Sequence, residues 1–204
     1  MKKILFTGIL FMLLLPVSIY ALDINLNSNY LTITGNFDDC TVSNEKRGEL
    51  QFCSVTIEEY ASTAEPGKAL VPLYTKLVSL PSTGNFVLES ITYDYDERVV
   101  DQSIQHFGWE DKIEKDNSFY QSDEWYPKEI VEIGSPVIMR GYRFCQISLA
   151  AIQYNPAKNV IRVLKNINAK FLLDSTISEN PLLDTKSRPS SSFSKIVSEH
   201  VYGA

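Results

Sequence analysis

The sequence predicts an all-β fold, an antiparallel β-sandwich with one long loop and a short C-terminal helical segment. The first observation is that short segments of alternating apolar and polar residues recur along the chain, separated by Gly, Pro and Asn. Such a period of two is typical of half-buried strands joined by turns. The second observation is that no stretch has the spacing of a long amphipathic helix. Many short strands at these intervals indicate a sandwich.

Six segments carry the strand pattern. Gly141, inside the fifth segment, predicts a bulge or bend in that strand. The turn signal of residues 155–159 predicts that the last two segments form a hairpin. In chain order the segments cover residues 30–34, 50–60, 70–80, 86–95, 137–149 and 159–173.

The inward-facing positions of these segments predict the hydrophobic core. Burying side chains of this kind stabilises a fold by about 1.5–3 kcal/mol each, before entropy costs. The predicted core residues are Leu31, Ile33, Leu50, Phe52, Leu73, Leu77, Phe86, Leu88, Val137, Cys145, Ile147, Leu149, Val163, Ile167 and Phe171.

Residues 101–127 depart from the strand pattern, because they are charged and rich in aromatic residues. Loops of this length in a compact domain are commonly functional. Two interpretations are open at this stage: a functional loop, or a surface excursion whose aromatic side chains pack back on the sandwich. The aromatic residues include Trp109, Tyr120, Trp125 and Tyr126.

The end of the chain, residues 179–204, predicts a linker followed by a short amphipathic segment. Asn180-Pro181 and the Ser-rich residues 186–192 have linker composition. Apolar residues then recur at helical spacing. They are Phe193, Ile196, Val197 and Val201.

Residues 1–21 have the layout of a secretory signal peptide. Lys2 and Lys3 precede an apolar run from Ile4 to Leu15, and small residues up to Ala21 close it. The run is shorter than the roughly 20 residues that a membrane-spanning helix needs. We therefore expect export to the periplasm or cell surface of a bacterium, cleavage after Ala21, and a β-sandwich domain over residues 22–178.

The charge of the exported part makes nucleic acid an unsuitable partner. Removing residues 1–21 leaves 17 of the 19 Lys and Arg residues against 25 Asp and Glu, a net charge of −8. Nucleic-acid binding needs a basic surface. No other stretch is apolar enough to span a membrane, so no membrane contact is expected after removal of the signal.

Three cysteines are present, and export makes disulfides possible. Cys40 and Cys53 flank the polar turn of residues 43–48, so two strands that meet there predict a Cys40–Cys53 disulfide. Cys145 alternates with Ile147 and Leu149, and is predicted to be a buried, inert thiol.

Active-site chemistry is missing from the residues. The two histidines, His106 and His200, are too few for a zinc site. A Cys145–His106 nucleophilic pair lacks any local signature, and the acidic residues 94–97 lack the pattern of a calcium loop. No phosphate-binding glycine loop or nucleophile elbow is present. No catalytic residue, metal or cofactor is therefore expected.

Four blocks of the sequence resemble, in order and spacing, the propeptides of gingipain-type cysteine peptidases. The first block consists of residues 59–60 and residues 66–81, and the latter stretch starts with Pro66-Gly67-Lys68-Ala69-Leu70. The second and third are Tyr126-Pro127 with residues 136–143, and residues 152–157 with the hairpin that continues to Leu164. The fourth is residues 192–196. The resemblance covers about residues 22–204.

The resemblance implies a secreted β-sandwich prodomain that assists folding of a peptidase and keeps it latent. It implies a gingipain-type catalytic domain as partner, in cis or in trans, and no catalysis by this chain. In the arginine- and lysine-specific members a loop presents a basic side chain to the specificity pocket. Here that loop corresponds to residues 101–118, with Lys112 and Lys115 as candidates and the uncharged Gln105 or His106 as alternatives.

A second function class is suggested by the aromatic residues of the long loop. Trp109 and Trp125 would suit a β-sandwich module that binds carbohydrate or a surface protein, because aromatic faces pack well against both. Exposed, coplanar rings would favour this alternative, and rings that pack against the sheet would count against it.

Overall fold

The computed structural model describes residues 22–37, 40–110, 112–183 and 189–204; the predicted signal peptide, residues 1–21, lies outside the described residues. The strands are β1 (Asp23–Leu26), β2 (Tyr30–Gly35), β3 (Thr41–Arg47), β4 (Leu50–Thr56), β5 (Ala61–Ser62), β6 (Pro72–Ser79), β7 (Asn85–Val99), β8 (Val131–Ile133), β9 (Val137–Met139), β10 (Tyr142–Ala150), β11 (Ile152–Asn155), β12 (Val160–Asp174) and β13 (Val201–Tyr202). The helices are α1 (Asn117–Tyr120) and α2 (Ser191–His200).

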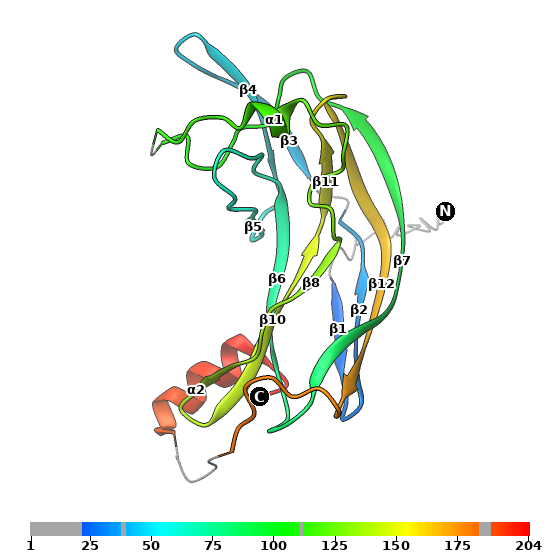
Figure 1. The fold of residues 1–204 in the computed structure, drawn as a ribbon, viewed down its shortest axis with the longest axis vertical. Helices are drawn as coiled ribbons and strands as arrows, with labels where there is room; N and C mark the ends of the chain where they lie inside the picture. Colours follow the sequence, from blue (N-terminus) through cyan, green and yellow to red (C-terminus); the bar gives the residue numbers. More distant parts are fainter. Residues whose placement is uncertain (1–21, 38–39, 111, 184–188) are drawn as a thin grey trace, which may run out of the picture.

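Two sheets face each other, so the predicted antiparallel sandwich is confirmed (Figure 1). The first has the order β1-β2-β12-β11, and β7 lies along the other edge of β12. The second has the order β13-β6-β10-β8, with β5 on β6 and β9 on β10. All pairs are antiparallel except β13 with β6. The hairpin of β3 and β4 forms a separate two-stranded sheet, which projects beyond one end of the sandwich (Figure 1).

The chain passes from one sheet to the other at Ala151. β10 belongs to the second sheet and β11 to the first, with this one buried residue between them. The predicted hairpin around residues 155–159 is confirmed, but β11 rather than the long β10 forms its first strand. Of the bulge or bend predicted at Gly141, the structure shows a sharp bend: Arg140 and Gly141, with φ 48° and 85°, form the turn between β9 and β10, so the predicted strand is divided there. Two positive φ values suit a tight hairpin turn.

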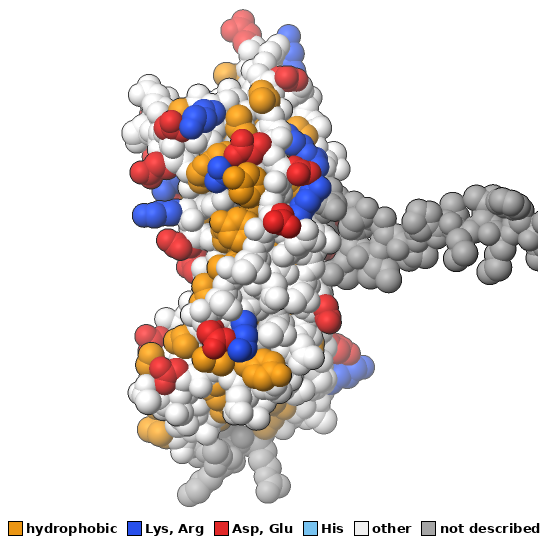
Figure 2. All heavy atoms as spheres, turned by 90° about the vertical axis from the view of Figure 1, so that its right-hand side faces the viewer, with side chains coloured by type: hydrophobic (Ala, Val, Ile, Leu, Met, Phe, Trp, Pro, Cys, Tyr) orange, Lys and Arg blue, Asp and Glu red, His pale blue; other side chains and the backbone are white. Residues whose placement is uncertain are grey.

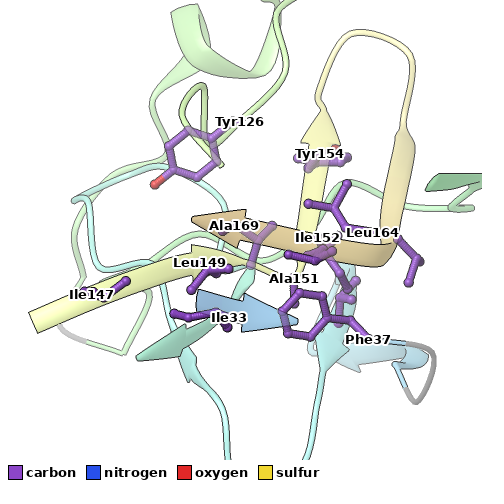
Figure 3. Packing of buried hydrophobic residues seen from close by; sticks show 14 of the residues in the cluster. Ile33, Phe37, Tyr126, Ile147, Leu149, Ala151, Ile152, Tyr154, Leu164 and Ala169 are labelled. Carbon is purple, nitrogen blue, oxygen red and sulfur yellow. The ribbon is translucent and has the colours of Figure 1, made fainter. Parts of the chain in front are cut away.

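The core fills the space between the sheets, and Figure 3 shows part of it, including Ile33, Ile147, Leu149 and Ala169. Ten of the predicted core residues are buried: Leu31, Ile33, Phe52, Phe86, Cys145, Ile147, Leu149, Val163, Ile167 and Phe171. These positions were predictable because strand alternation determines which face a side chain occupies.

Three predicted core residues are exposed instead. Leu50 lies on the projecting hairpin, Leu88 on the edge strand β7, and Val137 at the start of the short β9. Leu73 and Leu77 are half-buried. For the three exposed residues the alternation is present, but no second layer covers that part of the strand, whereas Leu77 packs against the cluster under α2.

The predicted C-terminal helical segment is confirmed as α2, which Figure 1 shows against the β6–β10 sheet. The Ser190 side chain caps it by accepting a hydrogen bond from the amide of Phe193. None of the described helices is long and apolar enough to cross a membrane.

Candidate functional site

The candidate site is the segment that follows β7, which we call the lysine loop and define as residues 103–110 and 112–117. Its first part is extended and lies between two other segments. On one side the amide of Cys53 donates to the carbonyl of Ser103 at 2.9 Å, and that of Gln105 donates to Cys53 at 3.0 Å. On the other side the amide of Leu70 donates to Gln105 at 2.8 Å. The loop is therefore anchored like a strand at its base.

The far end of the lysine loop is a closed turn between Gly108 and Ile113. The Ile113 amide donates to the Gly108 carbonyl at 2.9 Å. Gly108 has φ +84°, and a Cβ there would lie 2.4 Å from the Ile113 side chain. His106 completes the closure, because its Nε2 donates to the Ile113 carbonyl across 2.8 Å. Glycine and a buried imidazole thus determine the shape of the turn.

Residues 114–116 of the lysine loop, which lead back to the sandwich, pack directly against Gly67. A Cβ at Gly67 would lie 2.8 Å from the carbonyl oxygen of Glu114, so only glycine allows the chain to pass this closely. The Asp116 amide donates to the Gly67 carbonyl at 3.0 Å. The Asp116 carboxylate then caps α1, where hydrogen bonds from Ser118 and Phe119 lower its pKa.

Lys112 and Lys115 differ in what their side chains contact. Lys112 is exposed and has φ +60°, a left-handed conformation that is uncommon for a residue other than glycine. Lys115 folds back, with Nζ 3.8 Å from the centroid of the Tyr120 ring, and desolvation lowers its pKa. Lys115 thus has an aromatic partner close by in the chain, whereas Lys112 is exposed on a left-handed turn position.

A pocket of about 580 Å³ lies between the lysine loop and β4. The structure brings Gln105, His106, Lys112 and Lys115 together around it. His106 is buried, so it serves as floor and brace of the loop rather than as its tip. The other residues that line the pocket are Leu50, Gln51, Phe52, Ser103, Ile104, Trp109, Ile113, Glu114 and Asn117.

The sequence did not point to Gly108, Ile113 or the β4 wall as parts of this site. Pro66-Gly67 lies in one of the recognised blocks, and its contact with the loop supplies a structural reason for that block. Nothing in the local pattern of β4 indicates that it faces the lysine loop, because that contact depends on the Cys53–Ile104 bridge and on the Phe52–Trp109 ring contact, both between distant parts of the chain.

The predicted Cys40–Cys53 disulfide is not formed. The register of β3 and β4 pairs Cys53 with Asn44, whereas the residue after Cys40, Thr41, pairs with Thr56. Cys40 therefore lies beyond the Thr41–Thr56 pair, several residues along the hairpin from Cys53, and the two cysteines are not opposite each other. Instead, an Arg98 guanidinium nitrogen lies 3.4 Å from the Cys40 sulfur.

The thiol of Cys145 is buried in the core, as predicted. Burial raises its pKa to about 11, so it remains protonated at neutral pH, where a nucleophile needs the thiolate. Across the described ranges, no group of three or more His, Cys, Asp or Glu side chains is arranged to hold a metal ion.

The two tryptophans have separate partners. The Trp109 ring lies 5.7 Å from His106 and 6.4 Å from Phe52, centroid to centroid. The Arg162 guanidinium lies 3.7 Å from the centroid of Trp125 and 4.4 Å from that of Tyr95. Figure 2 shows the face of β7 and β12, where basic, acidic and hydrophobic side chains adjoin. A sugar would have to displace Arg162 to stack on that face of Trp125.

Comparison with known proteins agrees with this fold. The sequence profile of the family described as Propeptide_C25 matches residues 27–188. A structure described as the complex of Porphyromonas gingivalis RgpB pro- and mature domains matches with TM-score 0.73 and 17% identity, covering 88% of this chain and 95% of that one. A second, on the zymogenic latency of gingipain K from Porphyromonas gingivalis, matches with TM-score 0.65 and 18% identity, covering 78% and 96%. A search of curated proteins gives no significant match.

Family and fold agree with the absence of an active site in the residues themselves. The profile extends over more than half of the chain, and the solved structures share its architecture over most of their own length. The chain therefore belongs to the Propeptide_C25 family, and it is the non-catalytic propeptide region of a cysteine peptidase precursor.

Proposed function

We propose that this chain is an exported prodomain that acts as intramolecular chaperone and inhibitor of a gingipain-type cysteine endopeptidase. The partner is the catalytic domain of that peptidase, bound in cis or in trans. Residues 1–21 serve as the signal peptide, residues 22–178 form the prodomain sandwich, and residues 179–204 lead towards the catalytic domain.

The observation that carries the inhibitor role is the way in which Lys112 is held. Its side chain is exposed, while the turn that bears it is closed by the Gly108–Ile113 hydrogen bond and by His106. A loop that is already ordered loses little further conformational entropy on binding. A basic side chain on such a loop is suited to an acidic specificity pocket, because a charge-assisted hydrogen bond can form there.

Lys115, His106 and Gln105 take secondary roles in this proposal. The Lys115 ammonium already lies over Tyr120, and His106 and Gln105 hold the loop through hydrogen bonds. We therefore assign the mimicry of a substrate side chain to Lys112 and support of the loop to the other three.

The chaperone role draws on the family and the shared fold. The related structures are described as a complex of pro- and mature domains and as a study of zymogenic latency. The carbohydrate- or surface-protein-binding alternative has less support, because Arg162 covers one face of Trp125 and Trp109 packs against Phe52 and His106.

The proposal predicts that Lys112→Ala weakens inhibition of a lysine-specific gingipain-type peptidase from the same organism by about a hundredfold. The lost interaction is one buried charge pair in the complex. The inhibition constant of the purified chain, added in trans, measures the effect. Thermal melting should be unchanged, because Lys112 is exposed.

Lys128→Ala is the matched control, since it removes an exposed lysine outside the lysine loop, and it should inhibit like the wild type. Lys115→Ala removes only a supporting contact over Tyr120, so it should lose less inhibition than Lys112→Ala. If only Lys115→Ala lost inhibition, the basic side chain would be Lys115. A wild-type chain that neither binds nor inhibits the peptidase would refute the inhibitor role itself.

A further inference from the structure

We call the pocket of about 580 Å³ between β4 and the lysine loop the wedge. The two walls are joined at their base by the Cys53–Ile104 bridge, with hydrogen bonds of 2.9 and 3.0 Å. Among the described residues, that bridge is the only ladder contact between them. Beyond it the walls separate, and the pocket of about 580 Å³ fills the gap.

The floor of the wedge is apolar. Phe52 and Ile104 are buried there, and Trp109 stands against Phe52 and His106. The Nε2 of His106 already donates to the Ile113 carbonyl. The floor therefore favours an apolar guest over one that needs hydrogen bonds.

The rim of the wedge exposes apolar surface next to positive charge. Leu50, at the tip of β4, is 52% exposed although it borders an apolar pocket. Exposed apolar surface around a concave site is typical of protein contacts, and apolar side chains that fill such pockets dominate binding energy. Lys112 and Lys115 stand on the opposite rim.

We propose that this wedge receives an aromatic or branched apolar side chain from the surface of the peptidase, beside its acidic specificity pocket. The inference rests on the proposed function: Lys112 lines the wedge, so a partner that pairs with Lys112 lies over its mouth. The contact is reciprocal, because Lys112 enters the peptidase while a peptidase side chain enters the wedge. Lys112 supplies charge recognition and the wedge supplies an apolar anchor.

Two substitutions test the wedge without touching Lys112. Leu50→Ser removes the apolar rim, and Gln51→Trp fills the opening from an exposed position of β4. Each should raise the inhibition constant about tenfold and leave the melting temperature unchanged. Val99→Ser is the control, since it removes an exposed apolar side chain from β7, which lies in a different sheet from β4. It should inhibit like the wild type.

A photo-crosslinking residue gives a second readout that does not depend on inhibition. Placed at position 50 it should link the chain to the peptidase, and placed at position 99 it should not. If Lys112→Ala lost inhibition while Leu50→Ser and Gln51→Trp kept the wild-type constant and position 50 gave no crosslink, the wedge would be overturned and the proposed function would stand. A wild-type chain that does not inhibit overturns both.

Discussion

Arg143 is a buried cation whose partners in the described structure are all neutral. The side chain is 2% exposed, and desolvation lowers its pKa. Its three nitrogens donate five hydrogen bonds of 2.6–2.9 Å, which join β10 to the turn before β7 and to the chain after β12. The acceptors are the carbonyls of Pro81, Gly84, Glu179 and Asn180, and Oδ1 of Asn85.

This arrangement predicts that Arg143→Ala lowers the free energy of unfolding by about 3 kcal/mol or more, because several buried acceptors lose their donors. Arg143→Lys should recover only part of the lost free energy of unfolding, since an ammonium has three donors and lacks the planar donor arrangement of a guanidinium. Urea unfolding measures both.

Arg140→Ala is the control for Arg143. Arg140 is exposed and lies 5.0 Å from the centroid of the Phe193 ring, so its loss should cost less than about 1 kcal/mol. If Arg143→Ala cost no more than Arg140→Ala, the buried hydrogen bonds would not be structural determinants.

At the scale of elements, the lysine loop depends on a short helix, α1, that begins at its C-terminal end. α1 has only four residues, and Asp116 caps it by accepting hydrogen bonds from Ser118 and Phe119. Phe119 packs edge-on against Tyr126 at 4.9 Å, and the Tyr120 hydroxyl donates to the Ile104 carbonyl at 2.5 Å. Tyr126 belongs to the main core and Phe119 and Tyr120 pack against it, so these aromatic side chains pack back on the sandwich, as one of the two interpretations expected.

Asp116→Ala should therefore loosen the loop without unfolding the sandwich. We expect severalfold faster trypsin cleavage after Lys112 and Lys115, while Asp116→Asn, which can still cap a helix, stays close to the wild type. Equal cleavage rates in all three proteins would contradict a role for the cap.

The pH dependence of the loop follows from the sign of the Asp116 shift. Hydrogen bonds, first that from the Ser118 side chain, lower the pKa of Asp116 in the folded chain. Its contribution is therefore complete above the ordinary carboxyl pKa of about 3.9 and is lost as the pH falls through the lower, folded-state pKa. Asp116→Ala should lack this acid-dependent loss of loop order.

At the scale of the whole molecule, most buried hydrophobic residues of the described ranges belong to one of two clusters. The large one fills the sandwich. The small one contains Phe144, Val197 and Val201 and lies under α2. β13 then pairs in parallel with β6, and the Tyr202 hydroxyl donates to the Ile24 carbonyl of β1. The C-terminal segment thus contacts both sheets; its buried residues belong to the small cluster, and Tyr202 packs against the edge of the large one.

This division predicts that Val197→Asp releases α2 while the sandwich stays folded. A buried carboxylate without a partner is unfavourable, but it affects only the small cluster. Hydrogen exchange should show loss of protection in α2 and retained protection in β10 and β12. Ile196→Asp, at an exposed neighbouring position, is the control and should leave α2 protected.

Cooperative unfolding of the whole chain by Val197→Asp would show instead that the two clusters act as one. In that case the C-terminal segment would be part of the folding unit.

The sequence by itself determined the fold class, most of the core and the C-terminal helix. Alternation within a strand places Ile33, Ile147 and Phe171 on the inner face, and helical spacing places Val197 inward, because both patterns depend on backbone geometry over a few residues. The four recognised blocks likewise identified the family, and no tertiary contact was needed for it.

The tertiary structure alone decided which strands pair and which apolar strand faces are covered by a second layer. The strand pattern of Leu50, Leu88 and Val137 resembles that of core residues, but no second layer lies over them. Cys40 and Cys53 are close in sequence, yet the β3–β4 register separates them. Register and layering depend on contacts between distant segments, which local periodicity does not specify.

The candidate site divides in the same way. Lys112, Lys115 and His106 were predictable as residues of one loop, but their different roles were not. The Lys115 ammonium lies over Tyr120, His106 bonds to Ile113 and Lys112 is exposed, because Gly67 and β4, both far away in the sequence, determine the path of the loop. Contacts that close long stretches of chain are properties of the folded molecule, and here they give the two lysines different surroundings.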